Sequence, residues 1–253
     1  MSNPTPRVIA VIPARLGSTR LPRKPLLRDT GKYLFQHVVE SVAASRALDA
    51  VILATDSQEI ADAAAAVGAR FELTRQDHFC GTDRVAEVAS RYPSAEIVVN
   101  VQGDEPEVRA EDVDLLVATL EKSGADAATL AAPCPPDRVH DQGAVKVVLN
   151  VRGLALYFSR SPIPYPRFAT AMPEGRLHLL HAGLYAFRRP VLEEFARLEP
   201  TPLERTEGLE QLRLLEHGRT IAVGLLERPP RGIDTPADYQ RFLAEWRARR
   251  PGA

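Results

Sequence analysis

Strand and helix patterns alternate along the first half of this chain, and this alternation constrains the fold more than any other feature. Residues 8–12 form a continuous apolar run, which is typical of a strand buried on both faces. Further strand patterns occur at 51–54, 70–73 and 97–101, and helical patterns at 34–45, 56–68, 85–90 and 110–122. The alternation predicts an α/β, Rossmann-like fold, with a mostly parallel twisted sheet, helices on both faces and right-handed crossovers.

Local capping signals mark some of the helix ends. Asp56 is the predicted N-cap of the second helix, and Gly68 is its predicted end. Thr235 is the predicted N-cap of the last helix, which begins with Pro236 and has Asp238 three residues after the cap.

The rhythm changes in the second half of the chain. Strand patterns follow one another at 126–132, 145–149, 154–158, 183–187 and 221–225, and the proline-dense segment 161–173 predicts an irregular excursion. Leu209, Leu212 and Leu215 form one stripe of a predicted helix that ends at Gly218. We therefore expect one domain over 1–253, with a small inserted lobe at about 130–190.

Composition excludes several classes of protein. The 32 Lys and Arg residues balance 33 Asp and Glu, so the strong basic excess of a nucleic-acid-binding domain is absent. Cys80 and Cys134 cannot form a disulfide framework or a zinc cluster. The N-terminus lacks a signal-peptide pattern, and no apolar run approaches the ~18 residues of a membrane span. We expect a reduced, cytoplasmic protein without nucleic-acid partners or membrane insertion.

A basic loop follows the first predicted strand. Arg15, Arg20, Arg23 and Lys24 lie there beside glycine, serine and threonine. Ligands of such sheets bind at the carboxyl ends of the strands, where cations and backbone amides suit a polyphosphate. The loop matches neither a Walker A motif nor a GxGxxG motif. A solvated basic loop without a ligand is the alternative.

Two aspartates are candidate metal ligands. Asp104 follows the strand pattern at 97–101, just after Gly103, which permits close backbone approach. Asp234 immediately precedes the last capped helix. Mg²⁺ prefers one or two carboxylates together with phosphate oxygens and water. A surface turn at Asp104 and compensation of the helix dipole by Asp234 are the alternatives, since only the fold could bring the two side chains together.

Nine segments, taken in order, resemble the 3-deoxy-manno-octulosonate cytidylyltransferase family over nearly the whole chain. They are IPARLGSTRLPRKP (12–25), TD (55–56), GTDR (81–84), NVQGDEP (100–106), AVKVV (144–148), ALYFSR (155–160), HAGLY (181–185), LEQLR (209–213) and GIDTP (232–236). The resemblance implies a nucleotide-diphosphosugar-transferase fold. The implied reaction converts CTP and 3-deoxy-manno-octulosonate (Kdo) into CMP-Kdo and pyrophosphate, with Mg²⁺, for lipopolysaccharide biosynthesis. It also implies a homodimer, with much of the contact made by the smaller lobe.

The resemblance also implies site residues. The metal carboxylates fall on Asp104 and Asp234, and the phosphate-holding residues on Arg15, Arg20 and Lys24; of these five, all but Arg20 form the expected catalytic set. The nucleobase contacts fall on Ala14, Thr74, Arg75, Cys80 and Gly81. The sugar contacts fall on Gln102, Arg160, His181, Tyr185, Glu210 and Gln211. Without the resemblance, these last six would be interpreted as surface or core residues. No general base is singled out.

Some positions depart from the family pattern. Arg23 stands where the family usually has glycine, Phe79-Cys80 replaces Gln-Ser, and Tyr165-Pro166 replaces Trp-Asp. Three alternative functions stay open. The chain could use another acidic sugar, such as sialic acid or an amino-substituted Kdo, or it could bind nucleotide or sugar without catalysis. A metal-dependent glycosyltransferase is disfavoured, because no Asp-x-Asp follows the relevant strand.

Overall fold

The computed structural model describes residues 5–18, 20–78, 80–168, 177–229 and 231–249. The chain divides into two compact units, one formed by 1–113 with 230–253 and the other by 114–229. The segment 130–190, expected to form an inserted lobe, lies within the second unit, which extends beyond it on both sides.

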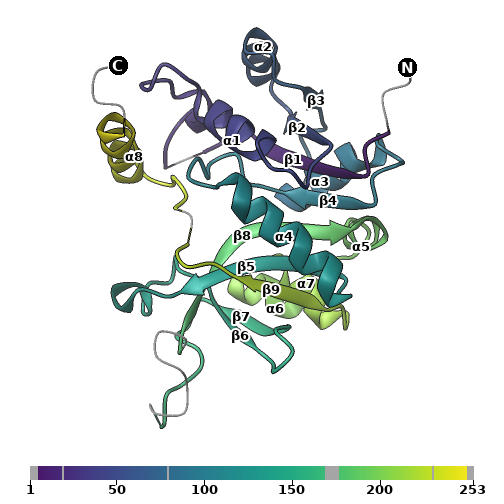
Figure 1. The fold of residues 1–253 in the computed structure, drawn as a ribbon, viewed down its shortest axis with the longest axis vertical. Helices are drawn as coiled ribbons and strands as arrows, with labels where there is room; N and C mark the ends of the chain where they lie inside the picture. Colours follow the sequence, from purple (N-terminus) through teal and green to yellow (C-terminus); the bar gives the residue numbers. More distant parts are fainter. Residues whose placement is uncertain (1–4, 19, 79, 169–176, 230, 250–253) are drawn as a thin grey trace. The chain divides into compact units, whose positions relative to one another are not determined.

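The first unit is built on a parallel sheet with the strand order β3-β2-β1-β4 (Figure 1). The strands are β1 (Val8–Ala14), β2 (Ala50–Thr55), β3 (Phe71–Leu73) and β4 (Ile97–Asn100). Successive residues of β1 from Val8 to Ile12 are all at most 2% exposed. Because neighbouring side chains of a strand point to opposite faces, both faces of the sheet are covered. The predicted α/β fold with a mostly parallel sheet is confirmed.

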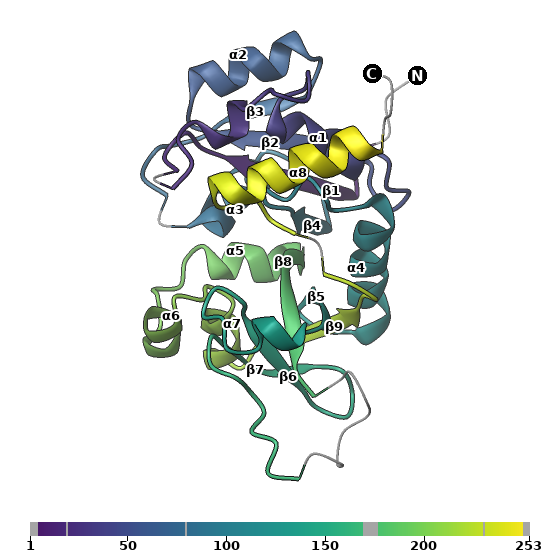
Figure 2. The ribbon, with the colours of Figure 1, turned by 90° about the vertical axis from the view of Figure 1, so that its left-hand side faces the viewer.

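Helices α1 (Leu34–Ala43), α2 (Gln58–Ala66) and α3 (Gly81–Ser90) pack against these strands. The chain returns to this unit at its end as α8 (Pro236–Ala248), which lies beside α1 (Figure 2). Tyr239 and Phe242 of α8 share a buried cluster with Leu34 of α1 and with Ile233. The predicted cap is confirmed, because the Thr235 hydroxyl accepts a hydrogen bond from the backbone amide three residues later.

The predicted cap at Asp56 is wrong. Helix α2 begins at Gln58, and its N-cap is Ser57, whose hydroxyl accepts a hydrogen bond from the Ile60 amide at 3.4 Å. The Asp56 carboxylate instead binds the guanidinium of Arg84 at 2.7 Å. The buried cation of Arg84 requires a counter-ion, whereas a serine satisfies the helix end equally well.

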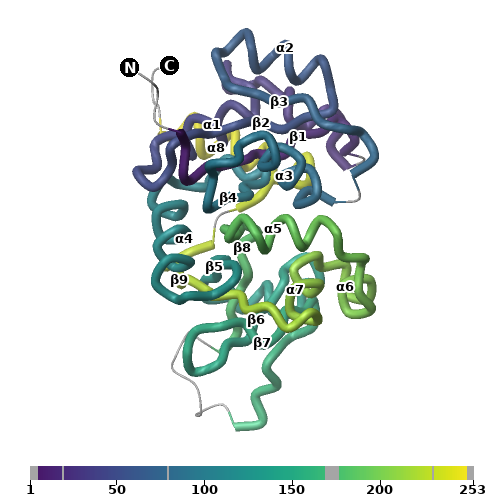
Figure 3. The backbone as a smooth tube through the Cα atoms, turned by 90° about the vertical axis from the view of Figure 1, so that its right-hand side faces the viewer, coloured from purple at the N-terminus to yellow at the C-terminus, as the bar shows by residue number. Residues whose placement is uncertain are grey.

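The second unit has β5 (Ala127–Pro133) at its centre, parallel to β9 (Ile221–Leu225) and antiparallel to β8 (Leu179–Arg188). The hairpin of β6 (Lys146–Leu149) and β7 (Ala155–Ser159) extends this sheet, because β6 also pairs with β8. Helices α5 (Arg189–Phe195), α6 (Pro202–Glu207) and α7 (Leu212–Glu216) follow in succession (Figure 3). The boundary between the units falls within α4 (Ala110–Ser123).

The helix expected from the stripe of Leu209, Leu212 and Leu215 is present as α7, which begins only at Leu212, and the chain turns at Gly218, with φ of 74°, where the helix was predicted to end. Gly208 ends α6 in the left-handed conformation, with φ of 64°, and α7 starts at Leu212. Leu209 is buried between the two helices. In the segment predicted to be irregular, residues 161–168 contain no helix or strand, as expected, and 169–173 lie outside the described residues.

None of the helices in the described part of the chain is both long enough and apolar enough to span a membrane.

Candidate active site

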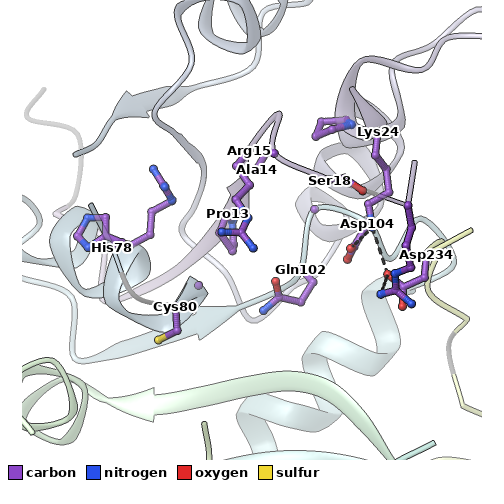
Figure 4. A pocket seen from close by; sticks show the side chains of 16 residues that line it. Pro13, Ala14, Arg15, Ser18, Lys24, His78, Cys80, Gln102, Asp104 and Asp234 are labelled. Carbon is purple, nitrogen blue, oxygen red and sulfur yellow. Dashed lines mark hydrogen bonds and ion pairs between the residues drawn. The ribbon is translucent and has the colours of Figure 1, made fainter. Parts of the chain in front are cut away.

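A cavity of about 310 Å³ opens in the first unit at the carboxyl ends of β1 and β4 (Figure 4). Its walls come from four segments, namely 13–25, 78–84, 102–104 and residue Asp234. The expectation that ligands bind where the first and fourth strands end is therefore supported by a pocket at that place.

Gly103 allows two walls of this cavity to touch. A Cβ atom at this position would lie only 2.7 Å from the carbonyl oxygen of Pro13, a distance that side chains do not tolerate. The Gly103 amide donates a hydrogen bond to that same oxygen at 3.3 Å. Glycine is required here because it lets the loops after β1 and β4 run in contact, which brings Asp104 toward Lys24.

The two predicted metal carboxylates meet at one ammonium group. The Nζ of Lys24 donates to Oδ2 of Asp104 at 2.6 Å and to the carbonyl oxygen of Ile233 at 2.7 Å. It lies 3.3 Å from Oδ1 of Asp234. The lysine side chain is only 10% exposed, so the three oxygens define a small, shielded position for a positive charge.

Ile233 explains how Asp234 reaches this position from the far end of the sequence. The Ile233 side chain is buried in the cluster between α1 and α8. Its amide donates to the carbonyl of Asp104 at 2.9 Å, so the two loops are joined through their backbones. Asp234 follows immediately and precedes the N-terminus of α8, where the helix dipole stabilises its negative charge.

Cations surround this position on the solvent side. Arg20 is exposed and lies 3.4 Å from Asp234, and Arg15 is exposed on another wall of the cavity. Arg23, the residue that replaces the glycine usual in the family, has a left-handed backbone with φ of 56°. It directly precedes Lys24 and pairs with Glu59. A glycine at this position would adopt the same conformation without a steric cost.

A third carboxyl group, that of Glu105, lies behind the pair. Its Oε2 is buried and has no hydrogen-bond partner among the described residues. Burial, with added repulsion from Asp104 and Asp234, raises the pKa of Glu105 to about 8. The sequence motif NVQGDEP contains this residue, but its spacing gave no reason to single it out. At neutral pH the group is largely protonated, so the negative charge is concentrated on Asp104 and Asp234.

Only some of the residues expected to contact the nucleobase lie at the other end of the cavity. Ala14, Cys80 and Gly81 line the cavity, whereas Thr74 and Arg75 do not. Gln102, expected to contact the sugar, lines the floor between the two ends (Figure 4). Its amide lies 3.4 Å from that of Asn100, a fully buried residue.

Two residues that were not among the predicted site residues, His78 and Arg84, also line the cavity. Arg84 belongs to the motif 81–84, so the resemblance could have indicated it, whereas His78 lies outside the nine segments. Their side chains are each 5% exposed, and each binds a carboxylate.

The other five predicted sugar residues lie in the second unit. The rings of His181 and Tyr185, both on β8, have centroids 5.4 Å apart, and Phe158 packs edge-on against His181. A bulge in β8 opposite Thr129 shifts the register between these two residues. Burial lowers the pKa of His181 to about 3, so the ring is neutral at physiological pH.

Arg160 is held by backbone oxygens. Its guanidinium donates to the carbonyls of Gln142, Glu207 and Gly208, the last two at the C-terminus of α6. Fully buried Lys146 donates to the Arg160 carbonyl at 2.7 Å and fixes the main chain there. Gln211 is 4% exposed, and its Nε2 has no hydrogen-bond partner among the described residues. Glu210 lies beside it and is partly buried.

Comparison with known proteins shows first which class of protein the chain resembles. A family model described as cytidylyltransferase matches residues 9–221. A 3-deoxy-manno-octulosonate cytidylyltransferase of Anaeromyxobacter sp. (strain Fw109-5) is 47% identical over 239 residues, covering 94% of this chain and 96% of that relative. One of Xanthomonas campestris pv. campestris (strain 8004) is 46% identical over 249 residues, covering 94% and 98%.

A solved structure agrees with these relatives. A CMP:2-keto-3-deoxy-manno-octonic acid synthetase complexed with CTP has a TM-score of 0.91 and 40% identity, and the match covers 96% of this chain and 99% of that one. The chain belongs to the 3-deoxy-manno-octulosonate cytidylyltransferase family, and the resemblance inferred from the nine motifs is confirmed.

Proposed function

We propose that this chain transfers CMP from CTP to the anomeric hydroxyl of Kdo, giving CMP-Kdo and pyrophosphate. Membership of the family supports the reaction. One structural observation carries the assignment of the site: the Lys24 ammonium lies within 3.3 Å of oxygens of both Asp104 and Asp234. Kdo links lipid A to the rest of lipopolysaccharide, so the product would serve lipopolysaccharide biosynthesis in the cytoplasm.

The reaction brings two anions together, a sugar acid and a triphosphate. Arg15, Arg20 and Lys24 would hold the triphosphate and spread the charge that develops on the departing pyrophosphate. Arg15 and Arg20 are exposed on the walls of the cavity, so they can turn toward a ligand. Alignment of the two substrates for in-line attack on the α-phosphorus could supply up to about 7–11 kcal/mol of the barrier reduction.

The residues present fit Mg²⁺. The ammonium of Lys24 already occupies a position bounded by two carboxylates and the carbonyl of Ile233, which are the hard oxygen donors this ion prefers. Within the described ranges, no group of three or more His, Cys, Asp or Glu side chains forms a metal cluster, so Asp104 and Asp234 would hold the ion. When bound, it would screen the repulsion between the substrates and favour ionisation of the attacking hydroxyl. Lys24 would then be free to turn to the phosphates.

The nucleobase would lie at the other end of the cavity, near Ala14, Cys80 and Gly81. Thr74 and Arg75 belong to the adjoining loop and would contribute carbonyl oxygens, because their amides donate to Thr55 and to Glu87. This arrangement places the cytosine away from the carboxylates and the triphosphate beside the basic loop.

The sugar would contact Gln102, Arg160, His181, Tyr185, Glu210 and Gln211. The Thr129 hydroxyl has one hydrogen, which the carbonyls of Ala182 and Leu184 can accept, so its oxygen accepts from Nε2 of His181 at 2.9 Å. Nδ1 of His181 is then an acceptor for a sugar hydroxyl. The ring is neutral, so the charge that pairs with the sugar carboxylate would come from Arg160.

A homodimer through the lobe at 130–190 is also part of the proposal. Among the described residues, the four most exposed large hydrophobic side chains all belong to this segment, namely Val151, Leu156, Tyr165 and Phe168. Large apolar side chains exposed in one segment are typical of an interaction surface. Sedimentation of the wild type and of Leu156→Asp tests this proposal: a dimer that the substitution dissociates is expected, and a monomeric wild type would contradict it.

The experiment that tests the reaction incubates the protein with Kdo, Mg²⁺ and each of the four nucleoside triphosphates, and follows pyrophosphate. Release is expected with CTP and to stop in EDTA. Parallel reactions with sialic acid and with amino-substituted Kdo decide the acceptor. Binding of CTP by calorimetry without any release would favour a binding module instead.

A further inference from the structure

The loop between β3 and α3 is held from one side by two side chains of α3. Arg84 provides the first contact. Its Nη1 donates to the Thr74 hydroxyl and, at 3.2 Å, to the Arg75 carbonyl, while its Nη2 donates to Asp56 at 2.7 Å. One guanidinium therefore ties the end of β2 and the start of the loop to the helix.

Glu87, one turn further along α3, provides the second contact. Its carboxylate accepts hydrogen bonds from the Arg75 amide at 3.1 Å and from the His78 ring. It also pairs with Arg91. Burial alone would raise the pKa of Glu87, but the hydrogen bonds from His78 and Arg75 outweigh it, and the pKa is lowered. The carboxylate therefore stays charged and keeps both loop contacts.

The contacts of Arg84 and Glu87 reach beyond the helix that carries them. Arg84 could satisfy Asp56 alone, and Glu87 could satisfy Arg91 alone. Instead, the two side chains together take the carbonyl and the amide of Arg75, the hydroxyl of Thr74 and the ring of His78. His78 lines the cavity at the end away from Lys24 and Asp104 (Figure 4), and Arg84 also lines the cavity.

We infer that Arg84 and Glu87 are positioning residues that fix the 74–78 loop and thereby set the discrimination between cytosine and uracil. The inference rests on the proposed function, which places the nucleobase at this end of the cavity. Cytosine presents an amino donor and an acceptor ring nitrogen where uracil presents an acceptor and a donor. A carbonyl oxygen of a fixed loop accepts from the amino group of cytosine but meets the carbonyl oxygen of uracil, which leaves both oxygens unpaired in a buried site. A loop free to shift could adapt to either base.

The test compares kcat/KM for CTP and for UTP, with Kdo as acceptor, in the wild type, Arg84→Met and Glu87→Gln. Both variants are expected to lower the CTP to UTP ratio at least tenfold. Arg84→Lys keeps a charge for Asp56 but cannot span both loop contacts, so it is expected to fold normally and still lower the ratio. Arg7→Met is the matched control, because it removes an exposed ion pair with Glu96 at the opposite end of the sheet.

Equal losses with both nucleotides, leaving the ratio at its wild-type value, would overturn the inference and assign the two residues a purely structural role. If Arg84→Met does not fold, Glu87→Gln and Arg84→Lys decide in the same way. A wild type that releases no pyrophosphate from CTP and Kdo would instead contradict the proposed function. The two failures are therefore distinguishable.

Discussion

The two groups of predicted site residues differ in their electrostatic surroundings. In the first unit, Asp104 and Asp234 are held around one cation, Lys24, at loops that follow strands. In the second unit, His181 and Tyr185 lie on a strand, where their rings pack against one another and His181 packs against Phe158. The first group holds charges for an ionic ligand, whereas the second contains the neutral ring of His181 together with the charged Arg160.

The difference shows in how each group is held. The aspartates depend on a backbone contact between loops, from the Ile233 amide to the Asp104 carbonyl. His181 depends on the fully buried Thr129, which bridges the bulge in β8. Changes to the first group should therefore affect chemistry with little effect on stability, whereas changes to the second should affect stability and its pH dependence.

The largest effect is expected for Asp104→Asn and for Asp234→Asn. Each substitution removes a charge without changing the shape of the side chain, so turnover should fall at least about 10³-fold while the thermal midpoint stays near that of the wild type. Steady-state pyrophosphate release and thermal unfolding measure the two quantities. Asp137→Asn, at an exposed position, serves as the control. Full Mg²⁺-dependent turnover in either active-site variant would refute the shared carboxylate site.

Lys24→Met should change the KM for one substrate and not for the other. It removes the ammonium but keeps the apolar stem, so the KM for CTP should rise about tenfold or more and the KM for Kdo should change little. Titration of each substrate at saturation with the other measures both. An effect confined to Kdo would contradict the assignment of Lys24 to the nucleotide.

Acid should lower the stability of the protein through His181, whose ring is neutral in the folded state. The pKa of His181 is near 6.5 in the unfolded chain and about 3 in the folded protein, so between these values the unfolded chain binds more protons. The free energy of unfolding should therefore fall as the pH drops below 6.5, by about 2 kcal/mol between pH 7.5 and pH 5. His181→Gln should remove this increment in denaturant titrations. The exposed His140→Gln control should retain it, and an unchanged pH profile in His181→Gln would be the contrary result.

The smallest effect concerns the basic loop. Arg23 has a left-handed backbone, so Arg23→Gly should raise the free energy of unfolding by up to about 1 kcal/mol, after the entropy of glycine in the unfolded chain is subtracted. Denaturant unfolding measures it. A loss of stability would show that the ion pair with Glu59 outweighs the strain.

Much of the fold follows from local signals in the sequence. Apolar runs such as 8–12 and the capping box at Thr235 depend on neighbouring residues only, and the structure has them where they were predicted. The positions of the candidate loops follow from the rule that parallel strands end at one edge of a sheet.

Long-range contacts could not be predicted in the same way. Asp56 has the sequence context of a helix cap, yet it pairs with Arg84, because a buried cation competes for it. The helix expected from Leu209 begins only at Leu212, because the chain still turns after Gly208, whose left-handed conformation ends α6. The buried oxygen of Glu105, which has no hydrogen-bond partner among the described residues, depends on residues far away in the sequence such as Asp234, and no spacing in the sequence encodes it.

Binding of Mn²⁺ in the presence of CTP, followed by electron paramagnetic resonance, tests the shared cation site most directly. Asp104→Asn and Asp234→Asn should each weaken Mn²⁺ binding at least about tenfold, and the double variant should be little worse than either, because both carboxylates hold one ion. Wild-type affinity in either single variant, or losses that simply add in the double variant, would contradict the account.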